Sequence, residues 1–148
     1  MAREAMLEIN CNRYSERIID VIKLFKECGW KYYNDEKRIE YLALGDIDDF
    51  DWQEKFLSEN ELEELIDHKQ DQFEQIGLNL YYEHSDEGLT LLAKDTKAII
   101  IVLNINRKTI TNERESITDV GWYLNNIIQR FWERECPIDY IKFEEYTD

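Results

Sequence analysis

Proline and glycine are scarce in this chain, with one proline and five glycines in 148 residues. So few chain breakers argue against a flexible linker or a low-complexity tail. The hydrophobic share of 43% and the aromatic share of 13% are typical of a folded protein and not of a disordered one. We therefore expect residues 1–148 to form a single globular domain.

Paired cysteines and membrane-spanning runs are also missing. The three cysteines, Cys11, Cys28 and Cys136, are odd in number and widely spaced, which argues against a disulfide framework and leaves no CxxC motif. No apolar run has membrane-spanning length, and the first residues do not resemble a signal peptide. We expect a cytoplasmic protein with reduced thiols, in which Cys28 and Cys136 act as small buried residues near helix ends.

Motifs for catalysis and for ligand binding are not found. The sequence has no nucleophile elbow, no P-loop and no dinucleotide-binding GxGxxG. The acids between Asp46 and Asp51 fit no EF-hand register, and the two histidines, His68 and His84, lack the companions of a zinc site. We therefore expect a protein that is not an enzyme and has no cofactor and no resident metal.

Basic residues are few, since the chain has 18 Lys and Arg but 33 Asp and Glu, which gives a net charge of −15. Such a chain lacks the basic surface that nucleic acids and anionic membranes require, so we expect neither as a direct partner. The charge favours fast, steered association with a cationic protein. An acidic composition that serves solubility alone is the simpler explanation, and the totals fit both.

Hydrophobic periodicity predicts three helices, over residues 14–28, 58–76 and 116–135. Ser15 is the candidate cap of the first helix, and Gly29 ends it. The third has Ser116 and Asp119 at its start, and Pro137 prevents its continuation.

The second helix has the clearest start signal in the sequence. Ser58 and Glu61 form a capping box, and Leu57 and Leu62 occupy the positions of a hydrophobic staple. The apolar face of this helix is predicted to extend through Phe73 to Ile76.

Six segments have the composition of strands: 30–33, 38–44, 78–83, 89–93, 98–104 and 138–146. Turns at 34–37 and 94–97 predict two hairpins. The run AIIIVLNI predicts a central strand buried on both faces, whereas residues 1–13 predict a frayed lead-in. The expected fold class is α+β, with a mainly antiparallel sheet of about five to six strands and about three helices packed against it.

The stretch from Gly45 to Asp67 contains ten acids and a single base, Lys55. Its glutamates from Glu59 onward suit the positive end of the helix dipole and need no further explanation. The acids before the helix are not explained by the helix dipole, and aromatic side chains lie among them. We predict a partner-binding surface there, made of Asp46, Asp48, Asp49, Phe50, Asp51, Trp52 and Glu54.

In its size, its acidity and its layout of hairpins and helices, the whole chain resembles the immunity proteins of bacterial polymorphic-toxin and contact-dependent growth inhibition systems. The resemblance implies a protein that binds and neutralises a cognate toxin, with a positively charged nuclease domain as the expected partner. Acids would steer the encounter and aromatic anchors would supply binding energy. Occlusion of the active site and binding elsewhere on the toxin both fit.

Two other functions fit the same sequence. A small cytosolic enzyme or ligand-binding protein would assemble its site from distant residues, and it predicts a deep pocket with converging polar groups. A nucleic-acid mimic predicts regularly spaced acids along an elongated surface. A toxin inhibitor predicts an exposed acidic patch with solvent-facing aromatic side chains.

Overall fold

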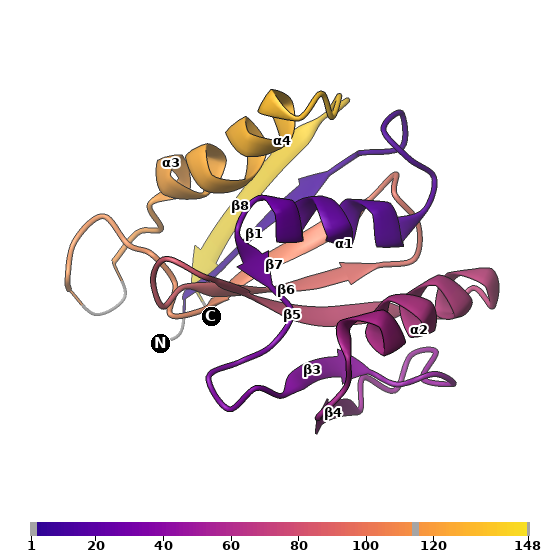
Figure 1. Cartoon of the computed structure of the whole chain (residues 1–148). Helices are drawn as coiled ribbons and strands as arrows, with labels where there is room; N and C mark the ends of the chain where they lie inside the picture. Colours follow the sequence, from indigo (N-terminus) through magenta and orange to yellow (C-terminus); the bar gives the residue numbers. More distant parts are fainter. Residues whose placement is uncertain (1–2, 114–115, 148) are drawn as a thin grey trace.

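The computed structural model describes residues 3–113 and 116–147 and contains one antiparallel sheet with helices packed against it (Figure 1). The strands are β1 (Arg3–Ile9), β2 (Trp30–Lys31), β3 (Ile39–Leu42), β4 (Trp52–Lys55), β5 (Ile76–Tyr82), β6 (Gly88–Ala93), β7 (Ile99–Ile105) and β8 (Ile141–Thr147). The helices are α1 (Ile18–Glu27), α2 (Glu59–Asp71), and a third helix made of α3 (Val120–Tyr123), the π-helical turn η1 (Leu124–Ile128) and α4 (Gln129–Glu133). The strand order is β4-β3-β5-β6-β7-β1-β8, and β2 also pairs with β5.

The α+β class, the antiparallel sheet and the three helices are confirmed, but the sheet has eight strands and not five to six. The expectation of a frayed lead-in over residues 1–13 is wrong for the part that the structure describes, because β1 lies inside the sheet between β7 and β8; residues 1–2 lie outside the described residues. Ala5, Leu7 and Ile9 of β1 are buried, and Glu4 and Glu8 alternate with them. The second missed strand is β4, which is short and largely exposed.

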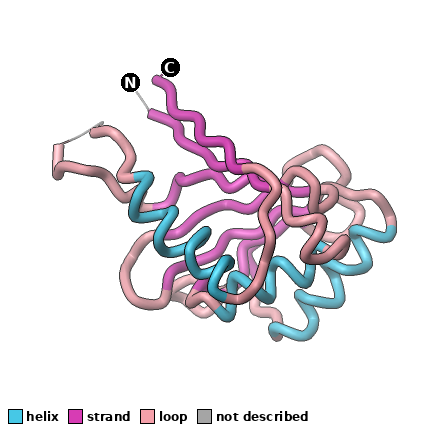
Figure 2. Tube along the Cα trace, turned by 90° about the horizontal axis from the view of Figure 1, so that it is seen from above, coloured by secondary structure: helices cyan, strands magenta, loops and turns pink. Residues whose placement is uncertain are grey.

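All the described helices lie on one side of the sheet (Figure 2). Every second strand residue points toward them, so that Leu7, Leu78 and Ile101 are fully buried. No described helix lies over the opposite side, which we name the helix-free face. Ile100 and Val102 of β7 are half-buried on it, so the prediction that this strand is buried on both faces is wrong.

The predicted hairpin across residues 34–37 is wrong in its pairing. Asn34 does close a turn, since its side chain accepts from the backbone N–H groups of Glu36 and Arg38. However, β2 and β3 do not pair with each other, and both pair with the same edge of β5. The hairpin of β6 and β7 across residues 94–97 is confirmed.

Two helix starts differ from the prediction. The N-cap of α1 is Arg17, and Ser15 lies before it, where its hydroxyl accepts the backbone N–H of Arg17. The third helix begins after Asp119, whose carboxylate caps the N–H of Trp122, while Ser116 lies in the preceding loop. The end of α1 before Gly29 is as predicted, and that glycine has φ of +95°.

The start of α2 is confirmed and its end is not. Ser58 caps Glu61, and Leu62 is fully buried. The helix ends at Asp71, because Phe73 adopts a positive φ of +59° and is 85% exposed. Ile76 is buried as part of β5 and not as part of the helix. No helix among the described residues is apolar and long enough to cross a membrane.

Candidate functional site

The seven predicted partner-binding residues lie on the loop between β3 and β4 and on β4 itself. We name the loop, residues 43–51, the acidic loop. Asp48, Asp49 and Asp51 are exposed, as are the apolar side chains of Ile47 and Phe50, at 54% and 46%. Sequence reasoning missed Ile47, because a single isoleucine among acids gives no pattern.

A buried ion pair lies beneath the acidic loop. Lys69 of α2 is 1% exposed, and its Nζ lies 3.2 Å from Oε1 of Glu74. The same ammonium donates to the backbone carbonyls of Ala43 and Asp46, at 2.5 and 3.0 Å. Glu74 in turn accepts the backbone N–H of Gly45 at 2.7 Å. A charge buried this deeply is tolerated only where it is fully paired, so the start of the loop is fixed onto α2.

Asp46 shapes the rest of the acidic loop and is not available to a partner. It is 9% exposed, and its carboxylate accepts the backbone N–H groups of Asp49, Phe50 and Asp51 at 3.0, 3.2 and 2.8 Å. Charge-assisted bonds of this kind are about twice as strong as neutral ones. Asp46 therefore organises the loop that displays the other predicted residues.

Phe50 has φ of +53°, in the left-handed region that aromatic residues rarely adopt. The cost of about 1–2 kcal/mol is met by the bonds to Asp46, one of which holds the N–H of Phe50 itself. Its ring lines a hollow of about 310 Å³ together with Leu92 and Ile100 of the helix-free face. Strained residues of this type gather at functional sites, where the surrounding structure holds them in place.

Trp52 begins β4 and is 38% exposed on the helix-free face. It pairs with Leu42, and Gly77 provides the space for both side chains. A Cβ atom at Gly77 would come within 2.7 Å of Leu42 and 2.9 Å of the Trp52 ring. One end of the Trp52 ring thus packs beside Gly77 while part of the side chain remains open to solvent, as in aromatic contact residues.

An acidic groove of about 630 Å³ lies beside β4, also on the helix-free face. Seven carboxylates line it, from Asp35, Glu36, Glu40, Glu54, Glu83, Asp86 and Glu87. Lys31 is the one lysine in its lining, and His84 and Tyr81 also contribute to it. Three of the acids come from the end of β5 and the turn after it, so no local sequence pattern could have joined them to the acidic loop.

Glu54 connects the groove to the acidic loop. It lies two residues beyond Trp52 on the same face of β4 and stands directly opposite Glu40 of β3. The amide nitrogen of Asn34 donates to both carboxylates, at 3.1 and 3.4 Å, and Arg38 contacts Glu54 at 3.3 Å. Like charges directly opposed across a strand pair are destabilising, so a cation bound here would relieve an existing repulsion.

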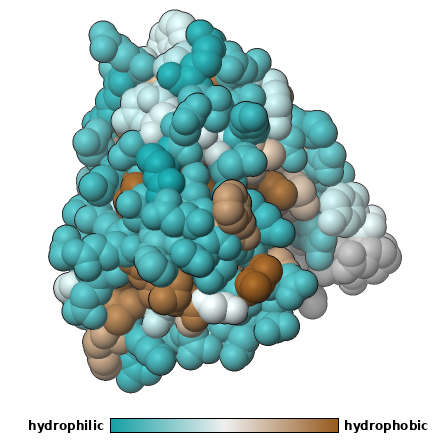
Figure 3. Space-filling model, turned by 90° about the vertical axis from the view of Figure 1, so that its right-hand side faces the viewer, coloured by the Kyte–Doolittle hydropathy of each residue, from teal (hydrophilic) through white to brown (hydrophobic). Residues whose placement is uncertain are grey.

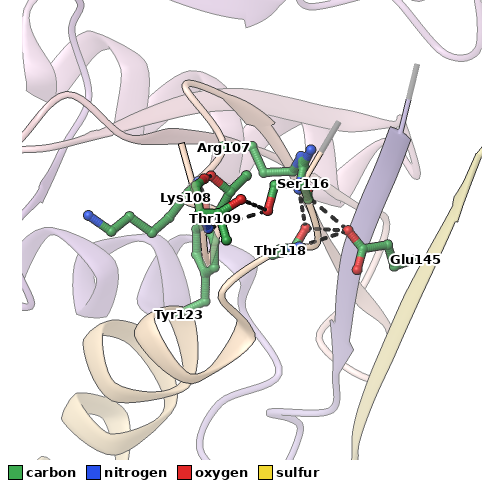
Figure 4. Close-up of polar contacts among 8 residues, drawn as sticks. Arg107, Lys108, Thr109, Ser116, Thr118, Tyr123 and Glu145 are labelled. Atoms are coloured by element: carbon green, nitrogen blue, oxygen red, sulfur yellow. Dashed lines mark hydrogen bonds and ion pairs between the residues drawn. The ribbon is translucent and has the colours of Figure 1, made fainter. Parts of the chain in front are cut away.

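A second polar cluster, drawn in Figure 4, serves the fold. Arg107 donates to the hydroxyl of Thr118 at 2.7 Å and lies 3.4 Å from Glu145 of β8. Glu145 also accepts from the backbone N–H and hydroxyl of Thr118, and Tyr123 accepts the N–H of Lys108. These bonds fasten the segment before α3 to the last strand.

The described residues contain no candidate metal site, and their cysteines lie in the core. No group of three or more His, Cys, Asp or Glu side chains there is arranged to hold a metal ion. All three cysteines are free and buried, as predicted for Cys28 and Cys136. Burial raises the pKa of the Cys28 thiol to about 11, so it is not an activated nucleophile.

Figure 3 shows one side of the molecule, which is mostly hydrophilic and on which hydrophobic residues form separate groups. The acidic loop, β4 and the groove therefore combine strain, exposed aromatic rings and concentrated charge in one region. Comparisons with known proteins add no family to this picture: no family model, no curated protein and no solved structure matches the chain.

Proposed function

We propose that this protein is a binding inhibitor of the immunity type, which neutralises a cognate toxin by docking onto its positively charged, nuclease-like domain. The observation that carries the proposal is the rigidly held acidic loop. It displays Phe50 and Ile47 among exposed carboxylates while Asp46, Lys69 and Glu74 hold its backbone. A loop already ordered in this way loses little conformational freedom on binding, which favours affinity.

The two parts of the surface have different tasks in this proposal. The aromatic side chains of Phe50 and Trp52 enter the contact and exclude water, as hot-spot residues do. The groove receives lysine or arginine side chains of the toxin among its carboxylates, which include Glu40, Glu54 and Glu83. The net charge of −15 accelerates the encounter.

Co-purification with the protein encoded beside it tests this function. The wild type should be recovered in a complex with that neighbour, and failure to bind it at low salt would refute the proposal. The surface is tested by the triple variant Asp48→Lys, Asp49→Lys and Asp51→Lys, which should slow association by at least about tenfold and leave folding intact.

A matched control keeps the change in net charge equal. Glu113, Glu133 and Glu135 are exposed and lie on α4 or in the loops beside the third helix. Replacing these three by lysine should slow association much less than the loop variant does. If both triple variants slowed association equally, net charge alone would govern the rate, and the acidic loop would not be the interface.

The groove alone favours a second candidate, the binding of a small polycation. A volume of about 630 Å³ lies within the range of small-molecule sites. Calorimetric titration with spermidine tests this, and saturable binding lost in the variant Glu40→Gln with Glu83→Gln would support it.

A further inference from the structure

No described strand pairs with the outer edge of β8. This strand ends the sheet order and pairs only with β1, through a register in which Leu7 faces Phe143 and Ile9 faces Ile141. Figure 2 shows the ends of β1 and β8 projecting together away from the helices. Among the residues that the structure describes, no backbone group bonds to the outer side of β8.

The register shows which backbone groups point outward. The N–H of Asn10 donates to the carbonyl oxygen of Tyr140, which directs the backbone of Tyr140 toward the β1 side. Since antiparallel bonding alternates along a strand, the backbone of Lys142 and Glu144 also faces β1. The N–H and C=O groups of Ile141, Phe143 and Glu145 therefore face away from the sheet.

Apolar and charged side chains alternate along β8, and this alternation allows the strand to pair with a copy of itself. Ile141 and Phe143 are 46% and 37% exposed on the helix side of the sheet. Lys142 and Glu144 are exposed on the helix-free face. Charges on an edge strand ordinarily discourage pairing. A second copy of the same strand, run antiparallel, instead meets each charge with its opposite.

We propose that the protein forms a symmetric dimer by antiparallel pairing of β8 with β8 of a second copy, centred on Phe143. In this register the two Phe143 residues are a hydrogen-bonded pair, and Ile141 bonds with Glu145 of the other copy through outward-facing backbone groups. Lys142 then lies directly opposite the second copy's Glu144, twice per dimer, and opposite charges in that position stabilise a strand pair.

Charge selects this register over its neighbour. Pairing centred on Glu144 uses the same outward backbone groups, but it places the two Glu144 carboxylates directly opposite each other, where they repel. The high net charge of each copy opposes association at long range and is screened beyond about 8 Å at physiological salt. The cross-strand pairs act at much shorter distances, so the dimer should tighten from low to moderate salt.

Sedimentation of the wild type and three variants tests the dimer. Lys142→Glu makes the chain more negative and Glu144→Lys makes it more positive, yet each places like charges opposite each other. Both should raise the dimer dissociation constant by at least about tenfold, and the double variant should restore it. If overall charge governed association, the two single variants would act in opposite directions, and the proposal would be overturned.

Hydrogen exchange gives an independent check of the edge. In the dimer the amides of Ile141, Phe143 and Glu145 should be protected, and dilution to monomer should release them while Lys142 and Glu144 stay protected by β1. A wild type that remains monomeric at about 200 µM refutes the pairing, as does protection of these amides only when the neighbouring protein is added.

Discussion

Glu40 and Glu54 stand directly opposite each other on β3 and β4, on the face of the sheet that has no helix. The two carboxylates share one donor, the amide of Asn34, and among the described residues a cationic partner, Arg38, contacts Glu54 but not Glu40. The fold therefore retains a repulsion at the point where the groove meets β4. In the proposed function, a lysine or arginine side chain of the partner would remove this cost.

Removing that repulsion should stabilise the free protein. Glu40→Gln keeps the acceptor for Asn34 and removes one charge, so we expect the free energy of unfolding to rise by about 0.2–1 kcal/mol at low salt. Urea denaturation at two salt concentrations measures it, and the gain should shrink at high salt. Asp48→Asn removes an exposed charge elsewhere and should change little. A loss of stability in Glu40→Gln would contradict the expectation.

The buried pair of Lys69 and Glu74 should be essential to stability. Lys69→Met keeps much of the side-chain volume but leaves Glu74 and two carbonyl oxygens without their partner, which costs about 3–5 kcal/mol. Adding Glu74→Met should recover part of this loss, because the unpaired charge is removed. Urea denaturation of both variants is the measurement, and a change below about 0.5 kcal/mol in Lys69→Met would show that the pair is not needed.

We expect Asp46 to matter because it holds the acidic loop in shape, and not because it touches a partner. Asp46→Ala removes three acceptor bonds and the support for Phe50 in its left-handed conformation, so we expect about 2–3 kcal/mol of destabilisation. Asp48→Ala, on the same loop but exposed, should stay within about 0.5 kcal/mol. Thermal unfolding compares the two. Equal stability of both variants would mean that the loop holds its shape without Asp46.

Stability should fall in the alkaline range. Burial raises the pKa of Cys28 from 9.0 to about 11 and that of Tyr123 from 10.0 to about 12. The unfolded state loses these protons first, so the contribution is complete below pH 9 and is lost as pH rises toward 11 and 12. The urea midpoint should therefore decline above pH 9. The urea midpoint of the Cys28→Ala variant should decline less steeply from pH 9 to 11. A decline as steep as that of the wild type would show that Cys28 does not contribute.

Local signals in the sequence predicted local structure well. The capping box of Ser58 and Glu61, the stop at Gly29 and the turn at residues 94–97 each depend on neighbours in the chain. The end of α2 was missed because Phe73 takes the positive φ that glycine normally provides. The strand β1 was missed because the strands that it pairs with, β7 and β8, lie far along the chain.

Several exposed residues of this region were predicted from the sequence, but the contacts that shape it were not, and that they bind a partner stays a prediction. Exposed acids and aromatic side chains at 48–52 followed from composition, and the structure shows them at the surface. The structural roles of Asp46 and Lys69 depend on backbone groups brought together by the fold, which a residue pattern does not encode. The groove depends on packing the turn after β5 beside β3, which is a tertiary contact as well.

The position of β1 also bears on how the chain folds. Its residues bond with β7 on one side and with β8 on the other, as in the pairs Met6 with Val102 and Leu7 with Phe143. Contacts between residues so far apart in sequence form slowly, because a long loop must close before any bond is gained. We therefore expect β1 to join the sheet late in folding, so that Leu7, Ile9 and the edge of β7 that faces them would stay exposed until then.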